Sequence, residues 1–373
     1  MQRNTKQQSI IKGLLVLGIS FLLFSCGDDP KTLEGAASTI FDGECVNETG
    51  EKIIVYSGRS ENLILPVIEA FVCETGVKVD TRWGSSTDMA LLIDEEGSKT
   101  QADVFLSRSP GPVGYLDGKG YLKPINTGVL DLVDDSMRSK NKTWIGFSGR
   151  QRVLVYNTDQ FSDDTLPASV FDLTSPEYEG KVAIPGSNGS FIDWFTILID
   201  QYGDTAAGEW IDQMVNNGAR YYPNNRSIVE AVGRGEIAMG LVNHYYNYKI
   251  SAATGAEHKA NNYVFKDNDI GGTLIISAAA VLESSDNVDQ AEDFLTYLLS
   301  AQVQSYFTET TYEYPIAAGI QPNSALSELQ AFEIGSIDFD SLGEGFENAN
   351  RLVESSGILN QSVSYTHLRA HET

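Results

Sequence analysis

The chain has 373 residues, and its 51 Asp and Glu against 26 Lys and Arg give a net charge of −25 at pH 7. A chain this acidic is not attracted to nucleic acid or to anionic lipid headgroups, so we expect no nucleic-acid partner. It has only four histidines, which argues against zinc hydrolases and histidine-based catalytic triads.

The N-terminus has the pattern of an export signal. Positive charges precede an apolar run at 10–24, which is too short and too N-terminal for a multi-pass membrane protein. The run ends in LFSC, which resembles the lipobox of bacterial lipoproteins. We therefore expect residues 1–25 to be a signal peptide and Cys26 to carry a lipid anchor. A plain signal anchor is the alternative.

Residues 26–51 are rich in Gly, Asp, Ser and Thr, and we expect a flexible tether between membrane and domain. Cys45 and Cys73 are the two cysteines that remain besides Cys26. In an exported protein such a pair suggests a disulfide, which would join the end of the tether to the first helix. Two unpaired, buried thiols are the alternative.

After the tether, strands and helices alternate. Runs of β-branched residues predict strands, and apolar residues at helical spacing predict helices, the first of which ends at Gly76. The expected strands are at 52–58, 77–83 and 102–107, and the expected helices are at 61–76, 87–97 and 111–120. This alternation predicts an α/β domain with a mainly parallel sheet.

The pattern continues further along the chain. A long strand is expected at 144–158, and the stretch 180–203 predicts a strand, a Gly/Ser/Asn loop and a helix that starts near Ser190. The remaining expected elements are helices at 205–218, 227–236 and 287–310 and strands at 237–244 and 272–282. No internal repeat is present, and we expect the chain to cross between two lobes more than once.

The last eleven residues, 363–373, read VSYTHLRAHET. They match, letter for letter, one reading frame of a transposase adapter used in shotgun sequencing libraries. We expect this segment to be an assembly artefact; a genuine C-terminal tail is the alternative. Two of the four histidines belong to it.

Adjacent tyrosines follow the strand expected at 237–244. The motif VNHYYNYK contains Tyr245, Tyr246 and Tyr248 together with His244. Taken alone, two neighbouring tyrosines are more often aromatic core residues than a binding site. Their meaning therefore depends on the surrounding sequence.

Five stretches of the chain resemble the ferric-ion-binding proteins of bacterial ABC importers. They are IIVYSGRSENLILPVIEAFVCETGVKV, EEGSKTQADVFLS, WIGFSGRQRVLVYNT, YPNNRSIVEAVGRGEIAMGLVNHYY and TETTYEYPIAAG, in the family's order and spacing over residues 52–357. The resemblance implies a two-lobed periplasmic binding protein fold of type II, with a ligand cleft between lobes joined by two crossing strands. Lobe 1 is then expected at 52–149 plus 272–322, and lobe 2 at 150–271 plus 323–357.

The resemblance implies that Tyr245 and Tyr246 bind Fe³⁺ as phenolates. This hard ion prefers anionic oxygen, and metal binding displaces the proton of a coordinating acid. Neighbours on a strand point to opposite faces, so we expect a helix to start within 243–248. We interpret Tyr248 as a packing residue, and His244 remains a weaker candidate ligand.

Two further ligand positions of some relatives are changed in this chain. A histidine and a glutamate in those relatives match Ser60 and Arg108, and neither offers an anionic oxygen. Other relatives use a third tyrosine near 187–191, where this chain has Phe191. Two phenolates do not fill the coordination sphere of Fe³⁺, so the resemblance implies a synergistic anion, carbonate or phosphate.

The expected anion seat follows the resemblance as well. Exposed N–H groups at a helix start favour anions. The positions that match the family's anion-binding loop and its two asparagines are Asn188, Gly189, Ser190, Asn225 and Asn243. Arg59 and Arg108 are expected to balance the anion's charge or to close the cleft, the alternative for each arginine being an ordinary salt bridge. Ser60 is expected to belong to the same binding site. We interpret Arg150 as structural.

Together these patterns predict a monomeric, lipid-anchored protein on the periplasmic side of the cell envelope. It would capture Fe³⁺, close like a hinge and deliver the ion to an ABC permease without being an enzyme. One alternative keeps the fold but binds a small oxyanion, a polyamine or another organic solute. Another is an extracytoplasmic hydrolase or transferase, which the shortage of histidines disfavours.

Overall fold

The computed structural model describes residues 32–326, 337, 339 and 342–361. The signal peptide expected at 1–25, the lipid anchor expected at Cys26 and the tail 363–373 lie outside these residues. Within the described part of the chain, no helix is both long enough and apolar enough to cross a membrane.

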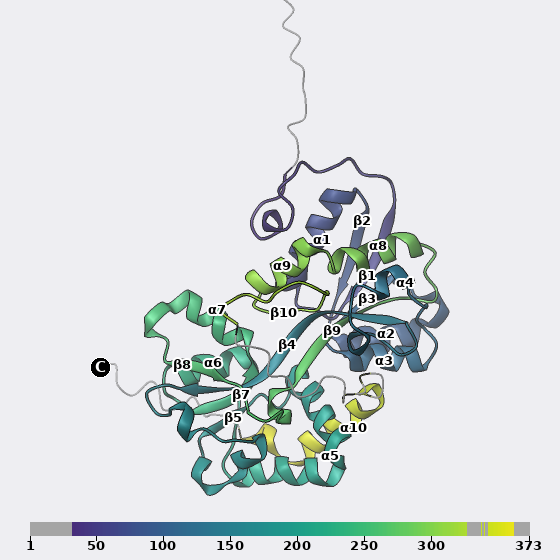
Figure 1. Ribbon diagram of the computed structural model, residues 1–373. Helices are drawn as coiled ribbons and strands as arrows, with labels where there is room; N and C mark the ends of the chain where they lie inside the picture. The colour runs from purple at the N-terminus through teal and green to yellow at the C-terminus, as the bar shows by residue number, and fades with distance from the viewer. Residues whose placement is uncertain (1–31, 327–336, 338, 340–341, 362–373) are drawn as a thin grey trace, which may run out of the picture. The chain divides into compact units, whose positions relative to one another are not determined.

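The strands form a sheet in which two parallel groups flank an antiparallel centre (Figure 1). The order is β2-β1-β3-β9-β4-β7-β5-β6, and β8 and β10 also pair with β4. The bounds are β1 Lys52–Ser57, β2 Lys78–Trp83, β3 Val104–Ser107, β4 Trp144–Asn157, β5 Val182–Ile184, β6 Arg220–Tyr221, β7 Met239–Asn243, β8 Ala260–Tyr263, β9 Leu274–Val281 and β10 Tyr314–Pro315. We call β2-β1-β3 the first strand group and β7-β5-β6 the second strand group.

The long strand β4 connects the two groups. Its residues 144–151 pair with β9, which in turn pairs with β3, while its residues 152–156 pair with β7. All residues of β4 are buried. The expected α/β class is therefore confirmed, and the parallel pairing is found within each strand group. The antiparallel centre differs from the mainly parallel sheet expected, because alternation along the chain does not reveal the direction in which distant strands pair.

The helices begin and end at local sequence signals. Their bounds are α1 Glu61–Thr75, α2 Ser86–Glu96, α3 Pro110–Gly118, α4 Thr127–Leu130, α5 Gly189–Asn216, α6 Asn225–Gly233, α7 Tyr245–Thr254, α8 Val288–Leu298, α9 Ala301–Glu309 and α10 Leu342–Ser355. Helix α1 ends at Gly76, which has a left-handed φ of 72° that glycine adopts readily. Non-helical angles at Gly203 divide α5 at the point where the sequence separates two helices.

The N-terminal described residues pack onto α1. Cys45 and Cys73 form a disulfide, which confirms the expected pairing. The N–H of Val46 donates to the carbonyl of Cys73, and Ala37 and Ile40 are buried. This part of the segment expected to be a tether is therefore fixed to the domain.

The disulfide closes a sequence separation of 28 residues, so it restricts the unfolded chain. Replacing both Cys45 and Cys73 by Ala should lower the free energy of unfolding by about 3 kcal/mol. Urea denaturation of the oxidised protein and of the double variant measures this difference. Identical unfolding midpoints would show that the bond contributes nothing to stability.

Candidate functional site

The two adjacent tyrosines lie where β7 passes into α7. Asn243 ends the strand, His244 has helical backbone angles, and α7 begins at Tyr245. The rings of Tyr245 and Tyr246 are stacked with centroids 4.3 Å apart. The expected helix start within 243–248 is thus confirmed, and both phenols lie on the same side of the chain.

Burial controls the protonation of Tyr245. Tyr245 is 6 % exposed, and burial, followed by the charge of Tyr246, raises its pKa well above the usual 10. The nearby Arg150 acts in the opposite direction but does not reverse the shift. Tyr245 is therefore a neutral phenol unless a stronger positive charge displaces its proton.

Two arginines of β4 interact electrostatically with these tyrosines: Arg150 with Tyr245, and Arg152 with both. Arg150 and Arg152 are fully buried, and burial lowers their pKa values to about 10 and about 9. The Nε of Arg150 and one terminal nitrogen of Arg152 have no hydrogen-bond partner. Among the described residues, neither arginine has a carboxylate oxygen within ion-pair distance. Both arginines thus carry buried positive charge without a direct ion pair, and the more distant carboxylates of Glu313 and Asp193 act on them favourably.

Arg152 was not identified by sequence analysis, although a signal was present. The stretch GRQRV places two arginines two residues apart inside a long strand with no other charged residue. Alternate residues of a strand share a face, so both side chains point to the same side of β4. A long apolar strand rarely contains charged residues unless they meet a partner or a ligand.

The structure brings all five residues expected at the anion seat together. The side-chain oxygen of Asn188 accepts hydrogen bonds from the N–H of Ser190 at 3.1 Å, from its hydroxyl at 2.6 Å and from the Asn225 amide at 3.2 Å. Arg152 donates to Asn243 at 3.0 Å and to Asn225 at 3.3 Å. The loop before α5 is thus joined through asparagine side chains to the buried arginine.

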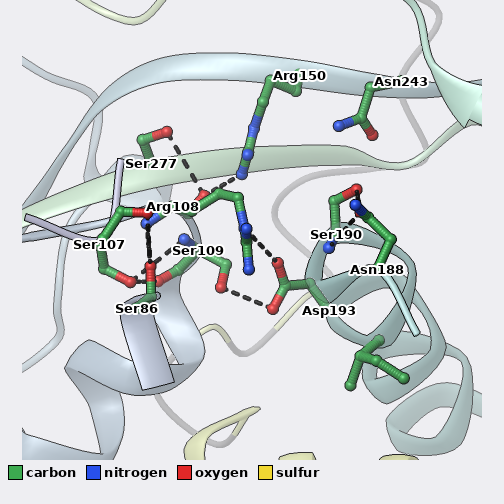
Figure 2. Close-up of polar contacts among 12 residues, drawn as sticks. Ser86, Ser107, Arg108, Ser109, Arg150, Asn188, Ser190, Asp193, Asn243 and Ser277 are labelled. Atoms are coloured by element: carbon green, nitrogen blue, oxygen red, sulfur yellow. Dashed lines mark hydrogen bonds and ion pairs between the residues drawn. The ribbon is translucent and has the colours of Figure 1, made fainter. Parts of the chain in front are cut away.

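Arg108 lies against this loop (Figure 2). A side chain at position 189 would collide with the Arg108 guanidinium, so Gly189 leaves the space that Arg108 occupies. The Nε of Arg108 is 3.9 Å from a carboxylate oxygen of Asp193, and the Ser109 hydroxyl donates to the other oxygen at 2.7 Å. Arg150 donates to the carbonyl of Arg108.

Arg59 and Ser60 lie in other surroundings. Arg59 donates to both carboxylate oxygens of Glu313, at 2.7 and 3.0 Å, and both side chains are buried. Its charge is thus balanced within the protein by an ion pair, the alternative that the sequence left open. Ser60 precedes α1, is exposed and makes no capping hydrogen bond.

His244 has both ring nitrogens engaged. Its Nδ1 accepts from the N–H of Gln151 at 3.1 Å, and its Nε2 lies 2.6 Å from the carbonyl of Tyr312, to which it donates. This arrangement disfavours His244 as a metal ligand. Tyr248 stacks on Tyr312 with centroids 5.6 Å apart, which agrees with its interpretation as a packing residue.

Other metal-binding groups are not gathered in the described part of the chain. No cluster of three or more His, Cys, Asp or Glu side chains suited to a metal ion occurs there.

Comparison with known proteins places this site in context. Residues 99–340 match the family described as bacterial extracellular solute-binding protein. The Fe(3+)-binding periplasmic protein of Serratia marcescens is 30 % identical over 87 % of this chain and 95 % of its own length. The major ferric iron-binding protein of Neisseria meningitidis is 30 % identical over 82 % and 93 %.

Two solved structures extend the comparison. Iron-bound HitA from Pseudomonas aeruginosa is 29 % identical and superposes with a TM-score of 0.77 over 82 % of this chain and 99 % of its own. The Trichodesmium protein IdiA (FutA), in complex with iron and citrate, is 28 % identical with a TM-score of 0.71, over 82 % and 99 %. The expected two-lobed type II binding protein fold is confirmed by these similarities.

Burial of His244 generates a pH prediction for the ligand-free protein. Burial lowers its pKa from the usual 6.5 to about 4, so the unfolded chain binds more protons than the folded one between these values. Stability should therefore fall as the pH falls from 6.5 towards 4, by about 3 kcal/mol from this group. Denaturation curves measured across this pH range should show the fall in the free energy of unfolding for the wild type but not for His244→Gln. Above pH 6.5 the unfolding free energies of the two proteins should depend on pH in the same way. Parallel losses in both proteins would mean that His244 does not titrate with folding.

Proposed function

Because the chain belongs to the family of bacterial extracellular solute-binding proteins, we propose that it captures ferric iron outside the cytoplasm and delivers it to an ABC permease. Relatives described as Fe(3+)-binding and ferric iron-binding proteins support this cargo. The observation that carries the proposal is the stacked pair Tyr245 and Tyr246 beside buried arginine charge. The protein acts as a carrier and not as an enzyme.

The two phenols bind Fe³⁺ after losing their protons. Ferric ion is hard and prefers anionic oxygen, and it is a strong enough acid to displace phenol protons. The buried Tyr245 is protonated in the empty site, so capture and proton release are the same event. Acid then favours release of the cargo.

A synergistic anion completes the coordination. Two phenolates leave part of the charge of Fe³⁺ unbalanced, and Arg150 and Arg152 add further positive charge. The loop at 188–190 offers a helix start and polar side chains for an anion. Carbonate or phosphate fits this seat, and the citrate in the iron complex of the Trichodesmium relative adds a third candidate.

The proposed lobes are 52–149 plus 272–322 and 150–271 plus 323–357, joined by β4 and β9. They close over the ion by a hinge motion. The protein is a monomer that Cys26 anchors by a lipid on the periplasmic side of the envelope. An anchored carrier of this kind remains close to its permease.

The buried arginines favour one second candidate. A small oxyanion or another anionic solute held by Arg150, Arg152 and the loop at 188–190 would balance their charge without a metal. In that case the tyrosines would contact the solute as neutral phenols. The iron-binding test below separates the two candidates.

Replacing Tyr245 or Tyr246 by Phe tests the iron site. Ferric phenolate absorbs visible light, so the wild type should become coloured on addition of one equivalent of ferric ion. Losing a residue that merely supports a metal ligand lowers metal affinity roughly 10–100-fold, and losing a ligand should cost more. Each single variant should therefore bind iron more than about 100-fold more weakly, and the double variant should stay colourless. Visible titration and competition with a chelator measure both effects.

Tyr248→Phe is the matched control. Tyr248 lies about one helical turn after Tyr245 on α7, and its ring stacks on Tyr312. It should retain both colour and affinity. A double Tyr245→Phe/Tyr246→Phe protein that still colours with ferric ion would end the proposal and favour the anionic solute.

The anion seat predicts that iron binding depends on the anion. Exchanging carbonate, phosphate or citrate for a non-coordinating anion should weaken iron binding at least about tenfold, since charged hydrogen bonds are lost. Arg152→Gln should reduce this dependence, whereas Arg226→Gln, at an exposed ion pair on α6, should not. Equal iron affinity in all anions would point to protein ligands in place of an anion.

A further inference from the structure

The loop that follows β3 meets the first turn of α5, and this contact joins the two strand groups. Ser109, two residues beyond β3, donates to Asp193 at 2.7 Å, and Arg108 lies 3.9 Å from the other oxygen of the same carboxylate (Figure 2). Residues 108 and 193 belong to opposite proposed lobes. None of the three side chains reaches the proposed iron ligands through a hydrogen bond or ion pair among the described residues.

Asp193 is a buried carboxylate that depends on this contact. It is 6 % exposed and Ser109 is 2 % exposed. The space beside them, lined also by Ile197 and Phe346, is about 10 Å³, which leaves room for no more than one water molecule. A buried charge is tolerated only when it is paired and hydrogen-bonded. Ser109 supplies one hydrogen bond, and Arg108 supplies a charge at 3.9 Å that makes no hydrogen bond to the carboxylate. Both residues come from the opposite proposed lobe.

Arg108 connects the same carboxylate to the anion seat. Its guanidinium occupies the space that Gly189 leaves open, directly beside the loop at 188–190. An anion on that loop and the carboxylate of Asp193 both attract this cation from the opposite lobe.

We propose that Ser109, Arg108 and Asp193 form a closure latch that holds the two lobes together over the filled site. The latch rests on the proposed function, because it requires a cleft that opens and closes around a ligand. When the lobes separate, Asp193 loses both partners and is solvated by water. The contact therefore exists only in the closed form, and it adds to affinity by favouring that form. Asp193 and Ser109 are positioning residues and touch no cargo.

The chain provides a matched control for this latch. Ser285 donates to the buried carboxylate of Asp103 at 2.6 Å, much as Ser109 donates to Asp193. Asp103 lies beside β3 and Ser285 follows β9, so this second pair lies within one proposed lobe. Removing either serine hydroxyl deletes one serine–aspartate hydrogen bond. Only the bond between Ser109 and Asp193 joins the two proposed lobes.

The decisive experiment compares Ser109→Ala with Ser285→Ala in iron release and in stability. Ser109→Ala should release ferric ion about tenfold faster and leave the melting temperature of the iron-free protein unchanged. Ser285→Ala should lower that melting temperature and leave iron release unchanged. Stopped-flow transfer of iron to a chelator, followed by the loss of visible colour, measures the rates.

Asp193→Asn provides a second test that keeps the shape of the side chain. Together with Ser109→Ala it should show non-additive effects on iron affinity and additive effects on the stability of the iron-free protein. X-ray scattering of the iron-loaded variants should show a larger radius of gyration than that of the iron-loaded wild type.

The two possible failures are distinguishable. If the wild type binds coloured iron but Ser109→Ala and Ser285→Ala release it at equal rates, the latch is wrong and the proposed function stands. If the wild type shows no iron colour, the proposed function fails and the latch fails with it. Non-additivity of equal size in the iron-free protein would also overturn the latch, because the contact would then exist without closure.

Discussion

The site depends on two arginines buried in the strand that holds the sheet together. Arg150 and Arg152 lie on β4, which pairs with both sides of the fold, and no carboxylate among the described residues forms an ion pair with either. Burying charge without a partner is unfavourable, and the lowered pKa values of both groups express this cost. Amide oxygens of Asn225 and Asn243 compensate only partly. The fold thus maintains buried positive charge beside the two tyrosines, which is the charge that the proposed anion would balance.

This constraint explains how neutral phenols and a ferric ion fit one site. Burial raises the pKa of Tyr245, so this phenol adds no negative charge to the empty site. In the proposed mechanism the trivalent ion creates its own anionic ligands by displacing phenol protons, and the excess positive charge recruits an anion to the loop before α5. The proposed function therefore couples capture to proton release and to anion uptake, and the proposed latch at Asp193 would couple it to the arrangement of the lobes.

Local patterns predicted much of this protein, and distant pairings explain the rest. Helical spacing and Gly76 predicted α1, and the pair Cys45 and Cys73 predicted the disulfide. The adjacent tyrosines predicted the start of α7. The partner of Arg59 is 254 residues away and that of Ser109 is 84 residues away, so no periodicity along the chain indicates either. The direction of the central strands was missed for the same reason. Arg152 is different, because its placement in an apolar strand was visible in the sequence.

Counting tyrosine ionisation during iron binding tests the central claim most directly. The ultraviolet difference spectrum between iron-loaded and iron-free protein reports phenolate formation, and magnesium-loaded buffer provides the blank for non-specific cation effects. The account predicts two phenolates for each ferric ion bound, from Tyr245 and Tyr246, with saturation at one ion per chain. Stoichiometric iron binding without any phenolate signal would contradict it.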